Sequence, residues 1–265
     1  MDFKQRTREI RRLTLTCIAS LGVGHVGGSL SIAEALSVLY SKHMSFDPKN
    51  PGMEGRDRLV LSKGHAGPAL YATLASFGFF DKEELKTLNR LGTKLPSHCN
   101  MLLTPGVDMT AGQGISCGVG LAIGSQLRND GAKIYVIVGD GECQEGQVWE
   151  AAMLAAHKKL DNLVVLVDNN KMQIDGLTEN VCGIEDVASK FDAFGFNTVR
   201  VNGNDEEEID RALCEADNVK GRPTCIVMDT VKGEGVSIFK NMGFANHSCN
   251  VSAEQLETAL AELED

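Results

Sequence analysis

The sequence predicts a doubly wound α/β fold, a mostly parallel sheet with helices on both faces. Short stretches rich in Val and Ile alternate with helical patterns, and these stretches are apolar at consecutive positions. Each leads into a polar or Gly-containing loop, and such folds bind ligands at the carboxyl ends of their strands. Because no segment has the composition of a linker, residues 1–265 are expected to form one domain, whose strand order the sequence leaves open.

The chain is expected to begin with two helices. Residues 3–20 carry apolar side chains at helical spacing, and the Gly-rich break GVGHVGG follows. Ser31 is of a type that caps helices, so it is expected to cap a second helix whose apolar stripe includes Ile32 and Leu36.

The remainder alternates strands with helices. The expected strands are residues 58–62, 133–138, 162–168, 197–201 and 224–229. The expected helices are residues 69–77, 147–158, 205–216 and 251–265. This alternation is typical of parallel sheets, whose strands are connected by crossover helices.

Composition excludes several classes of protein. The chain carries a net charge of −10, which counts against nucleic acid and anionic membrane surfaces as partners. No apolar run approaches the roughly 18 residues of a membrane span, and the charged N-terminus is unlike a signal peptide. The eight cysteines are scattered without a CxxC pair, so they signal neither a zinc site nor a disulfide framework. We expect a soluble, cytoplasmic protein.

Two polar turns each follow an apolar strand. In the motif GDG, Asp140 comes directly after the strand at 133–138, and in the motif NN, Asn170 comes after the strand at 162–168. Each motif alone is ordinary turn chemistry. The occurrence of both at the carboxyl ends of strands favours a cation site over that simpler interpretation.

The atoms expected at this site suit Mg²⁺ and a diphosphate. The carboxylate of Asp140, the amide oxygen of Asn170 and the backbone carbonyl of Met172 would hold the cation, and Ca²⁺ or Mn²⁺ could replace it. Gly141 and Glu142 begin the following turn, where a flanking glycine and free N–H groups let a diphosphate approach closely.

Histidines form a second line of observation. Two of the six, His43 and His157, fall in expected helices and are expected to be structural. The other four lie in Gly-, Pro- or Asn-flanked loops: His25, His65, His98 and His247. Imidazoles in such loops can hydrogen-bond sugar hydroxyls and move protons near neutral pH. Surface histidines and a four-histidine metal site remain alternatives, although short ligand spacings are missing.

The sequence around these motifs resembles the transketolase family. The matching segments are GDGECQEGQVWEA, LVVLVDNNKMQIDG and RLVLSKGHAGPALYATL, and the likeness extends from GHVGGSLS to the last helix. The resemblance implies the thiamine-diphosphate-binding fold, with thiamine diphosphate and Mg²⁺ as cofactors. The implied reaction transfers a two-carbon ketol unit from a ketose phosphate to an aldose acceptor, with pentose phosphates as the default substrates.

The resemblance also implies roles for the loop histidines. His65 would contact the cofactor near its diphosphate, while His25 and His98 would bind the donor around its carbonyl and first hydroxyls. His247 would bridge diphosphate and substrate and help to relay protons, although the usual Trp-His-Gly reads Asn-His-Ser here.

A loop near the cofactor departs from the family pattern. The segment GVDMTAGQGIS resembles the one that packs on the cofactor, with Gly112 expected to contact it. Transketolases usually carry a Gly-Pro-Leu or Gly-Ser-Leu insertion before Gly-Gln-Gly, and this chain lacks it. The departure bears on the substrate more than on the cofactor.

The resemblance further implies a partner chain. In full-length transketolases a second, pyrimidine-binding domain supplies the glutamate that hydrogen-bonds the cofactor's ring. The expected partner is therefore a C-terminal transketolase subunit, paired two plus two. Alternatives are a subunit of another thiamine enzyme, similar to 1-deoxyxylulose-5-phosphate synthase or pyruvate dehydrogenase, and a non-catalytic regulatory subunit.

Overall fold

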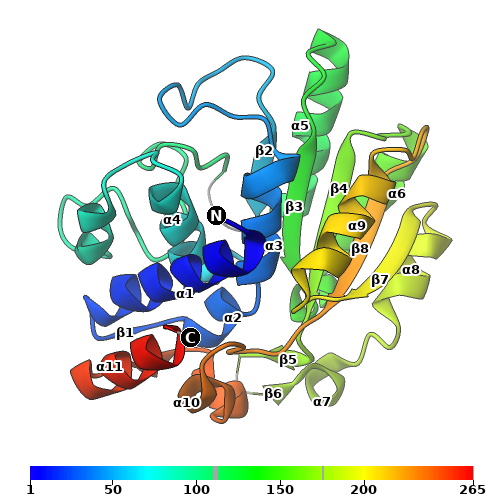
Figure 1. The fold of residues 1–265 in the computed structure, drawn as a ribbon. Helices are drawn as coiled ribbons and strands as arrows, with labels where there is room; N and C mark the ends of the chain where they lie inside the picture. Colours follow the sequence, from blue (N-terminus) through cyan, green and yellow to red (C-terminus); the bar gives the residue numbers. More distant parts are fainter. Residues whose placement is uncertain (110–112, 175, 265) are drawn as a thin grey trace.

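A five-stranded parallel sheet forms the centre of the computed structural model, which describes residues 1–109, 113–174 and 176–264. Its strands are β2 (Arg58–Leu61), β3 (Ile134–Gly139), β4 (Leu163–Asn169), β7 (Asn197–Asn202) and β8 (Thr224–Asp229). They lie in the order β2-β3-β4-β8-β7, so β3 and β4 are adjacent (Figure 1). The predicted fold class is confirmed.

Helices cover both faces of this sheet (Figure 1). On one face lie α1 (Phe3–Ala19), α3 (Ala33–Val38), α4 (Gly67–Ser76) and α9 (Glu206–Ala216). On the other lie α5 (Gly114–Arg128), α6 (Gly146–His157) and α8 (Val187–Ala193). Successive residues of β3 enter opposite cores, since Tyr135 and Ile137 pack on the first face and Val136 and Val138 on the second. Burial on both faces explains the unbroken apolar runs.

Shorter elements complete the chain. The helical ones are α2 (Val26–Leu30), η1 (Leu39–His43), η2 (Gly64–Ala66), η3 (Lys82–Thr87), η4 (Gly141–Gln144), α7 (Thr178–Cys182), α10 (Ser237–Lys240), η5 (Gly243–Asn246) and α11 (Ala253–Glu262). Two small antiparallel pairs join β1 (Val23–Gly24) to β9 (Cys249–Asn250) and β5 (Met172–Gln173) to β6 (Gly176–Leu177). In Figure 1, α2, α10, β5 and β6 gather near the carboxyl ends of the central strands.

Ser31 does not cap the second helix, so that prediction is wrong. The residue at the N-cap of α3 is Ile32, and Ser31 already has helical backbone angles (φ −65°, ψ −19°) at the C-cap of α2. An N-cap needs an extended backbone for its side chain to reach the first free N–H groups. The Ser31 hydroxyl instead donates to the Asp168 carboxylate at 2.8 Å.

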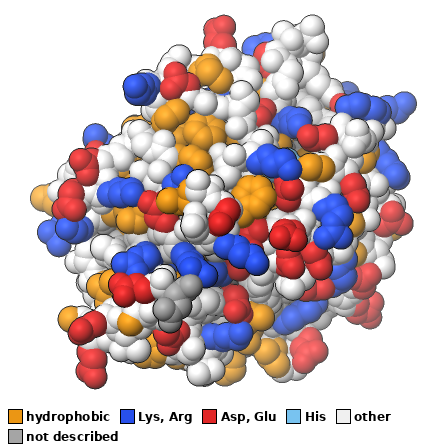
Figure 2. Space-filling view, in the orientation of Figure 1, with side chains coloured by type: hydrophobic (Ala, Val, Ile, Leu, Met, Phe, Trp, Pro, Cys, Tyr) orange, Lys and Arg blue, Asp and Glu red, His pale blue; other side chains and the backbone are white. Residues whose placement is uncertain are grey.

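The surface shows mixed charge. Lysine and arginine side chains are interspersed with aspartate and glutamate over the face drawn in Figure 2. No helix among the described residues has both the length and the apolarity that crossing a bilayer requires. The described cysteines are all free thiols.

Candidate active site

A cavity of about 640 Å³ opens at the carboxyl ends of β3 and β4. The predicted site residues that the structure describes all line it: His25, His65, His98, Asp140, Gly141, Glu142, Asn170, Met172 and His247. Gly112 lies outside the described residues. The fold therefore brings together side chains from distant loops, as the strand-end argument requires.

Asp140 is a buried carboxylate that accepts hydrogen bonds from uncharged donors. Its side chain accepts hydrogen bonds from the backbone N–H groups of Gly141 (2.8 Å) and Lys171 (2.6 Å) and from the Thr178 hydroxyl (3.2 Å). Burial, followed by the nearby Asp168 carboxylate, raises the pKa of Asp140 to about 6. A cation beside this carboxylate would relieve both effects, so the residue fits a metal ligand.

Asn170 is oriented by a buried ionic network that includes Asp168 and Lys63. Its amide Nδ2 donates to Asp168 Oδ2 at 2.9 Å, and its Oδ1 accepts from the Met172 N–H at 3.0 Å. Asp168 also accepts from Lys63, from Ser31 and from Thr230. Burial alone would raise the pKa of Asp168, but the Lys63 ammonium and these donors outweigh it and hold the pKa below its ordinary value.

The four loop histidines lie close together in the lining of the cavity. The ring of His25 lies 5.5 Å from that of His65, 5.9 Å from that of His98 and 5.2 Å from that of His247. Burial, followed by neighbouring positive groups, lowers the pKa values of His25 and His65. Both rings are therefore neutral at neutral pH, and each offers one N–H donor and one acceptor nitrogen.

His247 is held by a lysine that the sequence analysis missed. Lys232 Nζ lies 3.3 Å from His247 Nδ1, a distance at which the ammonium can donate to the ring. Burial, followed by the Lys63 ammonium, lowers the pKa of Lys232 to about 8.

Asn246 stands at the first position of the usual Trp-His-Gly and holds its loop in place. Its side chain is fully buried, and Nδ2 donates to the carbonyls of Lys232 and Phe239 at 3.0 Å each. It also packs so closely on Gly27 that a Cβ there would lie 1.8 Å from Asn246 Oδ1. The Asn thus ties η5 to α2 and to the lysine loop, which positions His247.

Glu142 points back toward the protein. Its carboxylate accepts from the Ser62 hydroxyl and from the Gly139 N–H (3.1 Å), and burial raises its pKa. Ser62 Oγ in turn accepts from the N–H of Gly114 at the start of α5 (2.9 Å). Glu142 therefore braces the wall of the cavity.

Sequence reasoning missed Lys63, Asp168 and Lys232. Lys63 and Asp168 lie in segments already quoted for the family resemblance, RLVLSKGHAGPALYATL and LVVLVDNNKMQIDG, and Lys232 begins the KGEG segment after β8. A charged residue at the end of an apolar strand indicates a candidate site, because a buried charge needs an ion-pair partner or a bound ligand.

The profile of the family described as "Transketolase, thiamine diphosphate binding domain" matches residues 3–263. This chain belongs to that family. The prediction from the motifs is thus confirmed, and thiamine diphosphate is the cofactor that this domain binds.

Curated relatives include proteins of matching length. The chain is 49% identical to the "6-deoxy-6-sulfo-D-fructose transketolase subunit SqwG" of Clostridium sp. (strain MSTE9), over 100% of this chain and 97% of that protein. It is 36% identical to one of the subunits of the apulose-4-phosphate transketolase of Phocaeicola vulgatus, over 96% of this chain and 91% of that protein. The chain is thus a subunit of a split transketolase and belongs to a transferase.

Solved transketolases share the fold but extend further. A transketolase from Pichia stipitis superposes with a TM-score of 0.93 at 32% identity, covering 100% of this chain and 41% of that one. The transketolase from Leishmania mexicana gives 0.91 at 30% identity, covering 99% of this chain and 41% of that one. The chain spans about two fifths of these structures.

Proposed function

We propose that this subunit holds thiamine diphosphate and Mg²⁺ in the cavity and, with a partner subunit, transfers a two-carbon ketol unit between sugars. The observation that carries the proposal is the convergence of four loop histidines in the same cavity as Asp140 and Asn170. The histidines suit a polyhydroxylated substrate, and the oxygens of Asp140 and Asn170 suit a cation bound to a diphosphate.

The metal would be held by three groups of this chain. Asp140 supplies a carboxylate, Asn170 an amide oxygen and Met172 its backbone carbonyl, an all-oxygen set that suits Mg²⁺ and would also accept Ca²⁺ or Mn²⁺. The raised pKa of Asp140 supports this role, because a bound cation compensates the desolvated charge. Gly141, Glu142, His65, His247 and, by family resemblance, Gly112 would contact the cofactor.

The cofactor, when bound, supplies a carbon nucleophile and an electron sink for the ketose. His25 and His98 orient the donor through its carbonyl and first hydroxyls. A neutral His25 can either donate to a carbonyl oxygen or accept from a hydroxyl. His247, which lies beside Lys232 in the lining of the cavity, would bridge diphosphate and substrate and help to relay a proton.

The donor sugar is proposed from the relatives. One relative is named for 6-deoxy-6-sulfo-D-fructose and another for apulose 4-phosphate, whereas a pentose phosphate was the default expectation. Because identity is higher to the sulfo-sugar protein, we propose a ketose with an anionic group far from its carbonyl, with 6-deoxy-6-sulfofructose as the first to assay.

The partner is proposed to be a C-terminal transketolase subunit in a two-plus-two heterotetramer. Two observations support it: the relatives are named as subunits, and the solved transketolases are more than twice as long as the part that this chain matches. We propose a cytoplasmic location for the complex, where its free thiols would stay reduced.

The proposal can be tested by co-expressing the chain with the product of the adjacent gene. We expect calorimetry with thiamine diphosphate and Mg²⁺ to show binding by the complex, and ketol transfer from a donor in its presence. Binding without turnover on any ketose would point to a regulatory role for this chain. Failure of both chain and complex to bind would overturn the cofactor assignment.

A further inference from the structure

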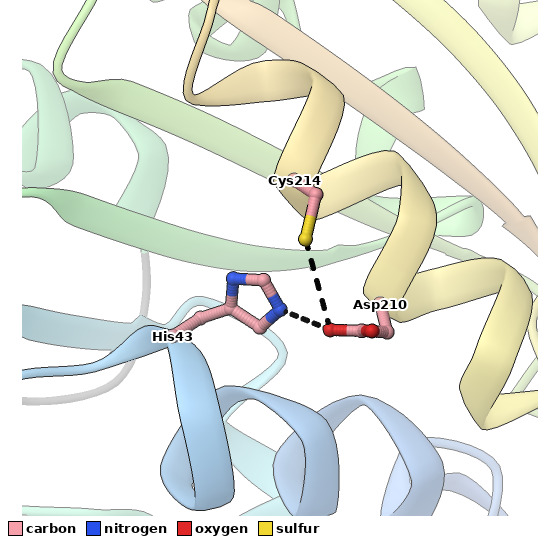
Figure 3. Close-up of side chains that lie close together, drawn as sticks. All are labelled: His43, Asp210 and Cys214. Atoms are coloured by element: carbon pink, nitrogen blue, oxygen red, sulfur yellow. Dashed lines mark hydrogen bonds and ion pairs between the residues drawn. The ribbon is translucent and has the colours of Figure 1, made fainter.

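A second cluster of ligand-type side chains lies away from the cavity, between η1 and α9. Within the described residues, His43, Asp210 and Cys214 place one potential ligand atom each within 4.8 Å of the others. Figure 3 shows the His43 ring pointing toward α9, where Asp210 and Cys214 stand one turn apart. Residues at i and i+4 share one face of a helix, so the sequence spacing itself aims both at the ring.

The distances are close to those of a bound metal. His43 Nε2 lies 2.6 Å from Asp210 Oδ1, and Cys214 Sγ lies 4.0 Å from the same oxygen. Tetrahedral zinc, with bonds of about 2.0–2.3 Å, separates its ligand atoms by roughly 3.3–3.6 Å. The first contact would open and the second would close by less than about 1 Å, and the third pair, His43 with Cys214, starts within 4.8 Å. Side-chain rotations can provide these changes.

The surroundings favour an ordered site. The His43 side chain is only 4% exposed and that of Asp210 22%, and the His43 carbonyl accepts from the Tyr135 hydroxyl. Lys42 Nζ donates to Asp210 Oδ2 at 2.7 Å, which holds the carboxylate with Oδ1 turned toward His43 and Cys214. Lys42 is half exposed, so solvent screens its charge from a cation on the other side.

We propose that His43, Asp210 and Cys214 bind Zn²⁺, with water as the fourth ligand. A nitrogen, a thiolate and one carboxylate oxygen form a ligand set that selects zinc over Mg²⁺. The ligands proposed for Mg²⁺ in the cavity are, by contrast, all oxygen atoms. The thiolate and carboxylate neutralise the charge of the ion. Zinc at this point joins α9 to the end of η1 and covers the Cys214 sulfur. The cysteine spacing could not signal the site, because its histidine is 167 residues from the aspartate.

Alkylation of the full wild-type chain tests the proposal directly. The reduced chain, freed of metal with a chelator, would be kept in excess Mg²⁺ with or without added Zn²⁺, labelled with iodoacetamide and mapped by mass spectrometry. We expect zinc to slow labelling of Cys214 by more than about tenfold. Cys182 is also exposed and provides the internal control, whose labelling should be unchanged. Equal labelling of Cys214 with and without zinc would overturn the proposal.

Substitution and cobalt spectroscopy test the ligands one by one. Co²⁺ in place of zinc should give a near-ultraviolet thiolate-to-metal band that is lost in Cys214→Ser and retained in Cys182→Ser. His43→Gln should weaken zinc binding by more than about tenfold, and His157→Gln, an exposed helical control, should not. A thiolate band that survives Cys214→Ser would contradict the site, as would zinc affinity that His43→Gln leaves intact. Any variant whose circular dichroism differs from wild type would be replaced by Asp210→Asn, with the same expected loss.

Discussion

Two buried aspartates at opposite edges of the sheet, Asp108 and Asp140, have different partners. At the amino edge, Asp108 accepts hydrogen bonds from Arg56, from Arg58 (2.9 Å) and from the Leu59 N–H (3.0 Å). At the carboxyl edge, Asp140 is similarly buried but accepts from two amides and a hydroxyl, and its pKa is raised to about 6.

The difference separates structure from function. A buried carboxylate paired with two guanidiniums is satisfied within the chain and has nothing left to bind. A buried carboxylate with a raised pKa has a destabilised charged form, which a bound cation would stabilise. Such carboxylates are common in binding sites. We expect substitution of Asp108 to change stability and substitution of Asp140 to change binding.

The largest effect is expected from Asp108→Ala. Removing the carboxylate leaves Arg56 buried without its partner, so the free energy of unfolding should fall by about 3–5 kcal/mol in urea titrations. Asp217→Ala, which breaks an exposed pair with Lys133 near the same edge, should cost less than about 1 kcal/mol. Equal losses of unfolding free energy in the two variants would contradict the expectation that the buried pair contributes more to stability than the surface pair.

Asp140→Ala should act on binding instead. The variant should lose Mg²⁺-dependent affinity for thiamine diphosphate by at least about 100-fold in calorimetry of the assembled complex, because the carboxylate is the charged metal ligand. Its urea midpoint without ligands should change little, since removal of a desolvated carboxylate offsets the loss of the three hydrogen bonds that it accepts. The exposed Asp192→Ala is the control. Unchanged cofactor affinity in Asp140→Ala would refute the metal assignment.

Lys232 should give a pH signature at the same edge. Its pKa is about 8 in the folded chain and ordinary in the unfolded chain, so between pH 8 and 10 the unfolded state binds more protons. Stability should therefore rise with pH in this window, by about 1–2 kcal/mol after allowing for partial solvent access. The measurement is the difference in unfolding free energy between wild type and Lys232→Met. A difference that stays constant from pH 8 to 10 would mean that Lys232 is charged throughout.

His98→Ala should show the smallest effect. The side chain is exposed, so folding should be unaffected, and the donor KM should rise several-fold, up to about tenfold, through loss of one hydroxyl contact. Affinity for thiamine diphosphate should stay within error, and His157→Ala on α6 should change neither quantity. A loss of cofactor affinity in His98→Ala would assign the residue to the cofactor instead of the donor.

Much of the candidate site could be predicted because its residues sit in local motifs. Asp140 and Asn170 each follow an apolar strand, and the loop histidines are flanked by residues that end helices and strands. These signals depend on near neighbours in sequence and on the rule that parallel strands share a carboxyl edge. Ser31 was misjudged for the opposite reason: its cap-like identity is local, but its partner Asp168 is 137 residues away.

The sequence by itself determined the fold class, the strand and helix periods, the family and the motifs that line the cavity. Each of these depends on the pattern of side chains that are close together along the chain. Tertiary structure decided the strand order, the neutral state of His25 and the low pKa of Lys232. It also decided the meeting of His43 with α9. Desolvation and long-range charge depend on what surrounds a group in space, and that becomes known only when distant segments are packed together.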